Sequence, residues 1–352
     1  MIALLNDAYE EGYKEGCSDT IKNLPKTPAT EEESEIPRHD ITNAAVAEFL
    51  KNVPENGYSQ SDKSRLIPHV FKIQERDEPS WTESINPYIV QGDGDKVTLS
   101  DGKTSVDYTP YLGTFRLTDL LPDKTYNWTM KKSGKEISRG QFKTYGVVRM
   151  VAFDDMTNVR DLYVPNYIKA GVLYRGANPD SIKVNSDDHK LLKRLGITTQ
   201  IDLRGNSARK DLFSNPYSFS VADYASVLTS TTNIKNVFTT LATSLSKGEK
   251  ILINCKSGAD RTGTICYLIQ ALCGVPQGIL EAHWELTSMG RWCNFKLWNY
   301  ERSSFAKGEM RSFVAAISKL YGANPYTHAY KYLTEKCGVS KTTIDTIVKA
   351  LK

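Results

Sequence analysis

The spacing of apolar residues changes twice along the chain and divides it into three parts. Residues 1–66 hold two short helical patterns, one around Leu4 and one over residues 40–53, with an acidic, proline-containing linker between them. From residue 67 to residue 146 apolar and polar positions alternate with a period of two, which predicts β-strands. Residues 147–352 alternate apolar runs with helical patterns, which predicts an α/β domain.

The third part contains a helical pattern followed by a strand pattern. Ser186 is a suitable N-cap for a helix that carries a stripe of leucines and ends before Gly196. The next residues, 197–204, predict a strand with Asp202 near its carboxyl end. Active-site groups of open α/β sheets collect at such strand ends, so we expect Asp202 to lie beside other functional residues.

A later segment has the order strand, short loop, helix. The apolar run Ile251–Ile253 predicts a buried strand, and apolar residues from Ile265 to Leu272 recur with helical spacing. This arrangement points backbone N–H groups and the positive end of the helix dipole at an anion. The nine residues Cys255–Gly263 between the strand and the helix are therefore a predicted anion site, with Cys255 and Asp202 as expected neighbours.

The side chains of this loop suit phosphoryl transfer to sulfur. The local field favours the thiolate form of Cys255, and Arg261 offers a planar fork of donors for phosphate oxygens. The hydroxyl of Thr262 is placed to hydrogen-bond the sulfur when it leaves phosphorus. A buried cysteine is more often an inert small hydrophobe, but the combined spacing favours catalysis. The residues predicted to bind phosphate are Lys256 (alternatively a solvated loop lysine), Ser257, Gly258, Ala259 and Gly263.

The Cys-x5-Arg spacing of residues 255–261 resembles the signature loop of protein-tyrosine and dual-specificity phosphatases. Residues 158–162, 171–178, 201–204 and 337–345 add blocks that resemble the atypical bacterial tyrosine and lipid phosphatases, over nearly all of residues 147–352. The resemblance implies a parallel-centred sheet flanked by helices with a helical lid, a nucleophilic Cys255 and a phosphate-binding Arg261. The aspartate before the arginine, here Asp260, is shared by that branch and by myotubularin lipid phosphatases.

Two positions depart from the pattern of that branch. Asn254 stands where a histidine usually precedes the nucleophile, which changes the hydrogen bonding behind the loop. Ala259 stands where a lysine often precedes the loop aspartate. The missing positive charge weakens the case for a multiply phosphorylated inositol lipid as substrate.

Two aspartates compete for the role of general acid. The surrounding positive charge favours the ionised form of Asp260 and opposes an acid role, whereas a bound phosphate dianion pushes the other way. Asp202 is expected outside the strongest positive potential of the loop. The alternative to a functional role for Asp202-Leu203-Arg204 is a strand end with a local ion pair. The resemblance favours Asp260.

The alternating part of the chain has a resemblance of its own. Leu120-Leu121-Pro122-x-x-x-Tyr126 resembles the tyrosine corner of fibronectin type III and related sandwiches, in which the tyrosine hydroxyl bonds back to the preceding loop. Residues 140–144 resemble their closing strand. The resemblance implies an all-β sandwich for spacing, protein docking or substrate presentation, without catalysis of its own.

Composition excludes several classes of function. The 352 residues carry a net charge of +4 without a basic stripe, which argues against nucleic acid as a partner. No apolar run reaches membrane-spanning length. Six cysteines without framework spacing argue against a disulfide scaffold, and the histidines lack paired ligand spacing, so we predict no metal and no cofactor. The β-domain favours export, whereas the reduced nucleophile and the lack of a visible signal peptide favour the cytoplasm.

The sequence therefore predicts a phosphomonoesterase that works through a cysteinyl-phosphate, most plainly a protein-tyrosine or dual-specificity phosphatase. One alternative is a phosphoinositide or inositol phosphate phosphatase with the same machinery. An alternative of another class is a catalytically weak pseudophosphatase that binds phosphotyrosine. Five aromatic residues after the loop helix are either core or the rim of a pocket that would stack on a phenyl phosphate: Trp284, Trp292, Phe295, Trp298 and Tyr300.

Overall fold

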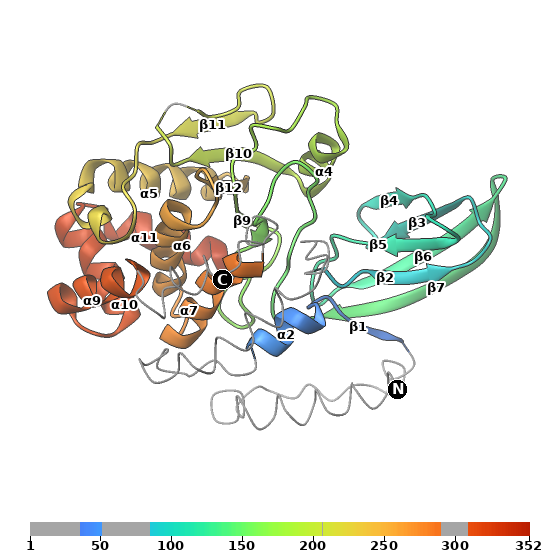
Figure 1. Cartoon of the computed structure of the whole chain (residues 1–352), viewed down its shortest axis with the longest axis horizontal. Helices are drawn as coiled ribbons and strands as arrows, with labels where there is room; N and C mark the ends of the chain where they lie inside the picture. The colour runs from blue at the N-terminus through green and yellow to red at the C-terminus, as the bar shows by residue number, and fades with distance from the viewer. Residues whose placement is uncertain (1–35, 51–84, 206, 290–308) are drawn as a thin grey trace.

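A computed structural model describes residues 36–50, 85–205, 207–289 and 309–352 (Figure 1). The helical pattern around Leu4 lies outside the described residues, as do Trp292, Phe295, Trp298 and Tyr300. The second helical pattern is confirmed as a short helix, α2 (Ala44–Leu50).

The alternating region forms a β-domain with two sheets. Its strands are β1 (Arg38–Asp40), β2 (Tyr88–Gln91), β3 (Lys96–Ser100), β4 (Ser105–Tyr108), β5 (Thr114–Leu117), β6 (Thr125–Lys132) and β7 (Lys135–Tyr145). One sheet has the order β1-β7-β6-β3-β4, and β2 pairs with β5 in the other. Every pair is antiparallel except β1 with β7. Side chains from both sheets share one core, which includes Val90, Val97, Phe115, Tyr126 and Phe142.

Two features of the β-domain relate to the predicted tyrosine corner and to the predicted domain boundary. The backbone N–H of Leu121 donates to the hydroxyl of Tyr126 at 2.9 Å, which is the hydrogen bond expected of a tyrosine corner. Strand β1 pairs with the end of β7, so a strand of this sheet lies before the predicted boundary at residue 67. The assignment to the fibronectin type III class remains a prediction.

The C-terminal part is an α/β domain with the expected parallel-centred sheet. The strands are β8 (Arg160–Asp161), β9 (Leu173–Gly176), β10 (Ile197–Asp202), β11 (Asn215–Ser218) and β12 (Lys250–Asn254), in the order β11-β10-β12-β9-β8. The first four strands of that order are parallel, and β8 is antiparallel to β9. Strand β12 is therefore the central strand of the sheet, and the predicted anion loop follows it.

Helices cover both faces of this sheet (Figure 1). Helix α4 (Asp187–Leu195) packs on one face with Tyr174 and Leu252. Its predicted caps are confirmed, because the Ser186 hydroxyl accepts from the N–H of His189 and Gly196 has φ 72°. The other face carries most of the core, with α5 (Thr231–Ser246), α6 (Asp260–Leu272), α7 (Gln277–Glu285), α9 (Glu309–Tyr321), α10 (Pro325–Lys331) and α11 (Lys341–Leu351). Short helical turns cover residues 224–229, 286–289 and 332–336.

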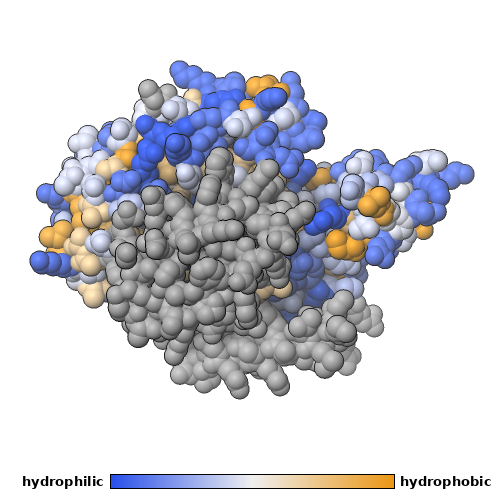
Figure 2. Space-filling view, in the orientation of Figure 1, coloured by the Kyte–Doolittle hydropathy of each residue, from blue (hydrophilic) through white to orange (hydrophobic). Residues whose placement is uncertain are grey.

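A buried arginine joins the β-domain to the α/β domain. The Arg149 guanidinium donates to the carbonyls of Asp119 (2.8 Å) and Leu120 (2.9 Å) in the β-domain. It also bonds Asp161 (3.1 Å) and the Tyr174 hydroxyl (2.8 Å) in the α/β domain. The β-domain protrudes from the body, and hydrophobic residues appear on it in separate spots (Figure 2). Within the described residues, no helix is both long enough and apolar enough to cross a membrane.

Candidate active site

The predicted anion loop connects the central strand β12 to helix α6. Cys255 follows the last residue of β12 and is 2% exposed. Asp202, at the end of β10, is paired in register with Asn254, so the expected proximity of Asp202 and Cys255 is confirmed. Helix α6 begins at Asp260, and the positive end of its dipole faces the loop.

Three consecutive carbonyl groups of the loop are held from outside. The carbonyl of Lys256 accepts from Asn178 Nδ2 at 2.9 Å and from the Asn178 backbone N–H at 3.2 Å. The Ser257 carbonyl accepts from Asn158 Nδ2 at 3.0 Å. The Gly258 carbonyl accepts from Arg175 Nη2 at 2.8 Å. All three donors come from the region of β8 and β9.

This pattern of contacts orients the peptide groups of the loop. In a planar trans peptide the N–H points opposite to the carbonyl. The N–H groups of Ser257, Gly258 and Ala259 are therefore directed away from those donors, and none donates a hydrogen bond to another described residue. Consecutive N–H groups of this kind match the predicted anion site, because such groups can form an anion-binding nest.

Only glycine fits at position 258. Gly258 has φ 67°, a left-handed conformation that side chains disfavour. A Cβ atom there would lie 2.4 Å from the carbonyl carbon of Gly176, at the end of β9. The close approach of these two backbones brings the Gly258 carbonyl within reach of Arg175.

The other predicted phosphate-binding side chains differ in exposure. Lys256 and Ser257 are exposed, Arg261 is partly exposed, and its Nη1 lies 3.4 Å from the Leu203 carbonyl. Ala259 is 4% exposed. Thr262 is fully buried, and its hydroxyl bonds no described residue, so the predicted contact with the Cys255 sulfur is absent from this structure.

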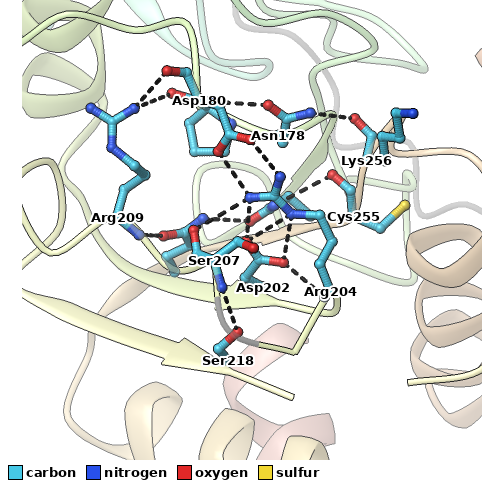
Figure 3. A network of polar contacts seen from close by, with 12 residues as sticks. Asn178, Asp180, Asp202, Arg204, Ser207, Arg209, Ser218, Cys255 and Lys256 are labelled. Atoms are coloured by element: carbon cyan, nitrogen blue, oxygen red, sulfur yellow. Dashed lines mark hydrogen bonds and ion pairs between the residues drawn. The ribbon is translucent and has the colours of Figure 1, made fainter. Parts of the chain in front are cut away.

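Asp202 belongs to an ion-pair network at the strand ends (Figure 3). It is fully buried, and its two carboxylate oxygens accept from Arg204 Nε and Nη2 at distances between 2.6 and 3.0 Å. Arg204 also binds Asp180, and its hydrogen bond lowers the pKa of the Asp180 carboxyl. In Figure 3 the sulfur of Cys255 points away from this network. The local ion pair considered for Asp202-Leu203-Arg204 is therefore present.

Asp260 has a different environment at the mouth of the loop. It is partly exposed, and its Oδ1 accepts from the hydroxyl of Tyr224. The Tyr224 ring lies 5.8 Å, centroid to centroid, from that of Trp284. A Cβ on Gly263 would lie 2.9 Å from the Trp284 ring, which is buried against α6. Trp284 thus belongs to the core and supports the ring that contacts Asp260.

Behind the loop, the Asn254 side chain joins a buried amide network. Its Oδ1 accepts from Gln200 Nε2 at 2.9 Å, and Gln200 Oε1 accepts from the Arg209 N–H at 2.6 Å. The Asn254 Nδ2 lies 3.5 Å from the Cys255 carbonyl, a weak contact. The asparagine therefore anchors the start of the loop to β10.

Several residues that support the loop were given no role from the sequence. They are Asn158, Arg175, Asn178 and Tyr224. Asn158, Arg175 and Asn178 lie inside the blocks of family resemblance, which was the available signal; Tyr224 gave none. No cluster of three or more metal-binding side chains occurs within the described part of the chain.

The loop lies at the carboxyl end of a central parallel strand, and donors near β8 and β9 hold three of its carbonyls. A family profile described as "Tyrosine phosphatase family" matches residues 151–352, which is more than half of the chain. The protein therefore belongs to the tyrosine phosphatase family. A comparison with curated proteins gave no significant match. Membership of this family supports phosphatase activity on a phosphorylated substrate.

Proposed function

We propose that this protein hydrolyses phosphomonoesters through a cysteinyl-phosphate, with phosphotyrosine in proteins as the substrate class. The observation that carries the proposal is the row of outward-held carbonyls at Lys256, Ser257 and Gly258. It supports a nest of amides beside Cys255, where the equatorial oxygens of a phosphoryl group would be bound. Arg261 would add a charged donor at the same place.

Both chemical steps use the same groups. The Cys255 thiolate attacks phosphorus, the S–P bond forms, and the bond to the leaving oxygen breaks. A carboxylic acid gives its proton to that oxygen. Water then attacks phosphorus, the same carboxylate takes a proton from it, and the S–P bond breaks to give inorganic phosphate and the thiolate.

We assign the acid to Asp260. Asp202 is fully buried, and Arg204 already occupies both of its oxygens. Asp260 is partly exposed, and the Tyr224 hydroxyl donates to its Oδ1 alone. Its Oδ2 is therefore the oxygen that would carry the proton to the leaving group. The hydrogen bond from Tyr224 also fixes the carboxylate at the loop mouth, where a leaving group would depart.

The nucleophile is tested with Cys255→Ser. The variant should lose turnover of an aryl phosphate by at least about 10⁴-fold while still binding inorganic phosphate, because the nest is intact. Hydrolysis by the serine variant at a wild-type rate would exclude the covalent mechanism. Absence of turnover in the wild type, with phosphate still bound, would favour the pseudophosphatase.

The acid is tested with two matched substitutions and two leaving groups. Asp260→Asn should lower kcat on phosphotyrosine by about 10²–10⁴-fold. The loss should shrink on an activated aryl phosphate, whose leaving oxygen needs no proton. Asp202→Asn should depress both substrates alike, as expected for a structural residue. A loss selective for the poor leaving group in Asp202→Asn instead would transfer the role to Asp202.

The substrate class is tested with a panel of phosphotyrosine peptides, phosphoserine peptides, phosphoinositides and inositol phosphates. We expect the highest kcat/KM with phosphotyrosine peptides, since Ala259 is apolar and buried where a lysine would have added charge. A preference for a polyphosphorylated inositol would select the lipid alternative.

A further inference from the structure

Arg175 lies beneath the catalytic loop and is almost completely buried. It is the third residue of β9, is 2% exposed, and lies on the same face of the sheet as Leu173, toward α6. Its register partner on β12 is Ile253, two residues before Cys255. A cation at this position is within the core of the domain and close to the nucleophile.

In the described part of the chain, the hydrogen bonds of Arg175 leave its charge without a counterion. Nη2 donates to the carbonyls of Gly258 (2.8 Å) and Ala259 (3.5 Å). Among the described residues, Nε has no hydrogen-bond partner and no carboxylate lies within ion-pair distance. An uncompensated buried cation is costly, so its presence suggests that an anion forms nearby in the working enzyme.

The acidic groups whose charge acts on Arg175 are those of the loop and its helix. Burial lowers the pKa of Arg175, and negative charge on Cys266, Cys255 or Asp260 raises it. Of the two thiols, Cys266 is fully buried within α6, and burial raises its pKa. Cys255 begins the loop whose Gly258 carbonyl Arg175 holds, so a thiolate formed there would be a counterion for Arg175.

Other charged or titratable groups also surround the loop. His283 adds no positive charge near the loop, because burial and the neighbouring arginines lower its pKa to about 3 and keep the imidazole neutral. Groups of this kind on the elements packed around the loop include Arg160 (β8), Arg175 (β9), Asp180, Asp202 (β10), Arg204, Tyr224, Lys256, Asp260, Arg261, Cys266 (α6), His283 and Glu285 (α7).

We propose that Arg175 is a positioning residue that fixes the loop carbonyl at Gly258 and supplies the buried positive charge that stabilises the Cys255 thiolate. The proposal rests on the proposed function, because it assigns a task to the same loop. It adds a second arginine to the site, on the side opposite to the substrate. Arg261 would act on the phosphoryl group from the mouth, and Arg175 on the sulfur from the core.

The test separates charge from hydrogen bonding with three variants. Arg175→Lys keeps a charge and a donor, Arg175→Gln keeps a donor without charge, and Arg175→Met keeps neither. Each protein is treated with iodoacetamide across a range of pH, and alkylation of Cys255 is followed by mass spectrometry. Arg149→Gln removes a buried arginine elsewhere and serves as the matched control. Circular dichroism confirms that each variant is folded.

The midpoint pH for alkylation of Cys255 should rise by about one pH unit or more in Arg175→Gln and Arg175→Met, since a nearby opposite charge shifts ionisation by that amount. Arg175→Lys and Arg149→Gln should stay within a few tenths of the wild-type midpoint. A wild-type midpoint in Arg175→Gln would overturn the proposal, and so would an equal shift in Arg175→Lys and Arg175→Met. Alkylation needs no turnover, so the expected shifts in an inactive wild type would refute only the proposed function.

Discussion

Two fully buried arginines on opposite sides of the sheet have opposite surroundings. Arg149, at the junction with the β-domain, bonds two carbonyls, one carboxylate and one hydroxyl. Arg175, beneath the loop that follows β12, has one good carbonyl contact and an Nε without a partner among the described residues. The two side chains are thus buried to a similar extent, and they differ in how many hydrogen-bond and ion-pair partners their guanidinium groups have.

In our proposal this difference separates a structural charge, Arg149, from a functional one, Arg175. A buried cation with a complete set of partners stabilises one arrangement of the chain, and removing it leaves the partners unpaired. A buried cation without a counterion raises the local potential and favours an anion beside it. The predictions below test that distinction, beginning with the largest expected effect.

The largest effect is expected on stability at the junction. Arg149→Met leaves Asp161 buried without its partner and should lower the free energy of unfolding by roughly 3–5 kcal/mol. Arg175→Gln removes a charge that has no carboxylate partner among the described residues, and it should change the free energy of unfolding by less than about 1 kcal/mol. Urea denaturation followed by circular dichroism measures both. Equal losses in the two variants would remove the distinction between the arginines.

The second effect concerns stabilisation by a bound anion. Inorganic phosphate at about 100 times its Kd should raise the free energy of unfolding by about 2.7 kcal/mol in the wild type. Arg149→Gln should show the same increment. In Arg175→Gln a tenfold weaker Kd at the same phosphate concentration would leave about 1.4 kcal/mol. Thermal denaturation with and without phosphate measures how much phosphate stabilises each protein. If phosphate stabilised Arg175→Gln as much as the wild type, Arg175 would not contribute to the electrostatic potential at the loop.

A third effect should appear in acid, at the histidine beside the unpaired charge. The pKa of His283 is lowered to about 3 by burial and by Arg160 and Arg175, whereas the unfolded chain has the ordinary value of 6.5. The unfolded state therefore binds the proton first, and the contribution of His283 is complete above pH 6.5 and is lost as the pH falls toward 3. Between pH 7 and pH 5 the loss should be about 2 kcal/mol.

His283→Gln provides the comparison for that loss. The free energy of unfolding of the variant should fall less steeply between pH 7 and pH 5, because glutamine binds no proton on unfolding. Chemical denaturation at several pH values compares the two proteins. Parallel curves would show that His283 does not control the acid limb.

The smallest effect is expected for an arginine at the junction that is not fully buried. Arg194 Nη2 lies 2.6 Å from Asp119 Oδ2, and the Arg194 side chain is 36% exposed. Solvent screens this pair, so Arg194→Gln should cost about 1 kcal/mol or less. A loss as large as that of Arg149→Met would show that position at the junction, and not burial, determines the cost.

The geometry of the loop after β12 was predictable because the residues that determine it are contiguous. A strand that ends at Asn254, a turn that needs Gly258, and a helix that begins at Asp260 lie within a few residues of one another. The caps of α4 were predictable for the same reason, since Ser186 and Gly196 adjoin the helix that they close. Even the ion pair of Asp202 with Arg204 spans two residues and was among the interpretations of the sequence.

The supports of the loop were decided by tertiary structure. Asn158, Arg175 and Asn178 lie 99, 83 and 78 residues from the carbonyls that they hold, and Tyr224 lies 36 residues from Asp260. These contacts exist because β9 lies beside β12 in one register, and a one-residue slip would turn Arg175 to the other face of the sheet. A local pattern of apolar residues sets which segments become strands. Only the packed sheet sets which strand lies beside the strand that leads to Cys255, and therefore which charge lies beneath the loop.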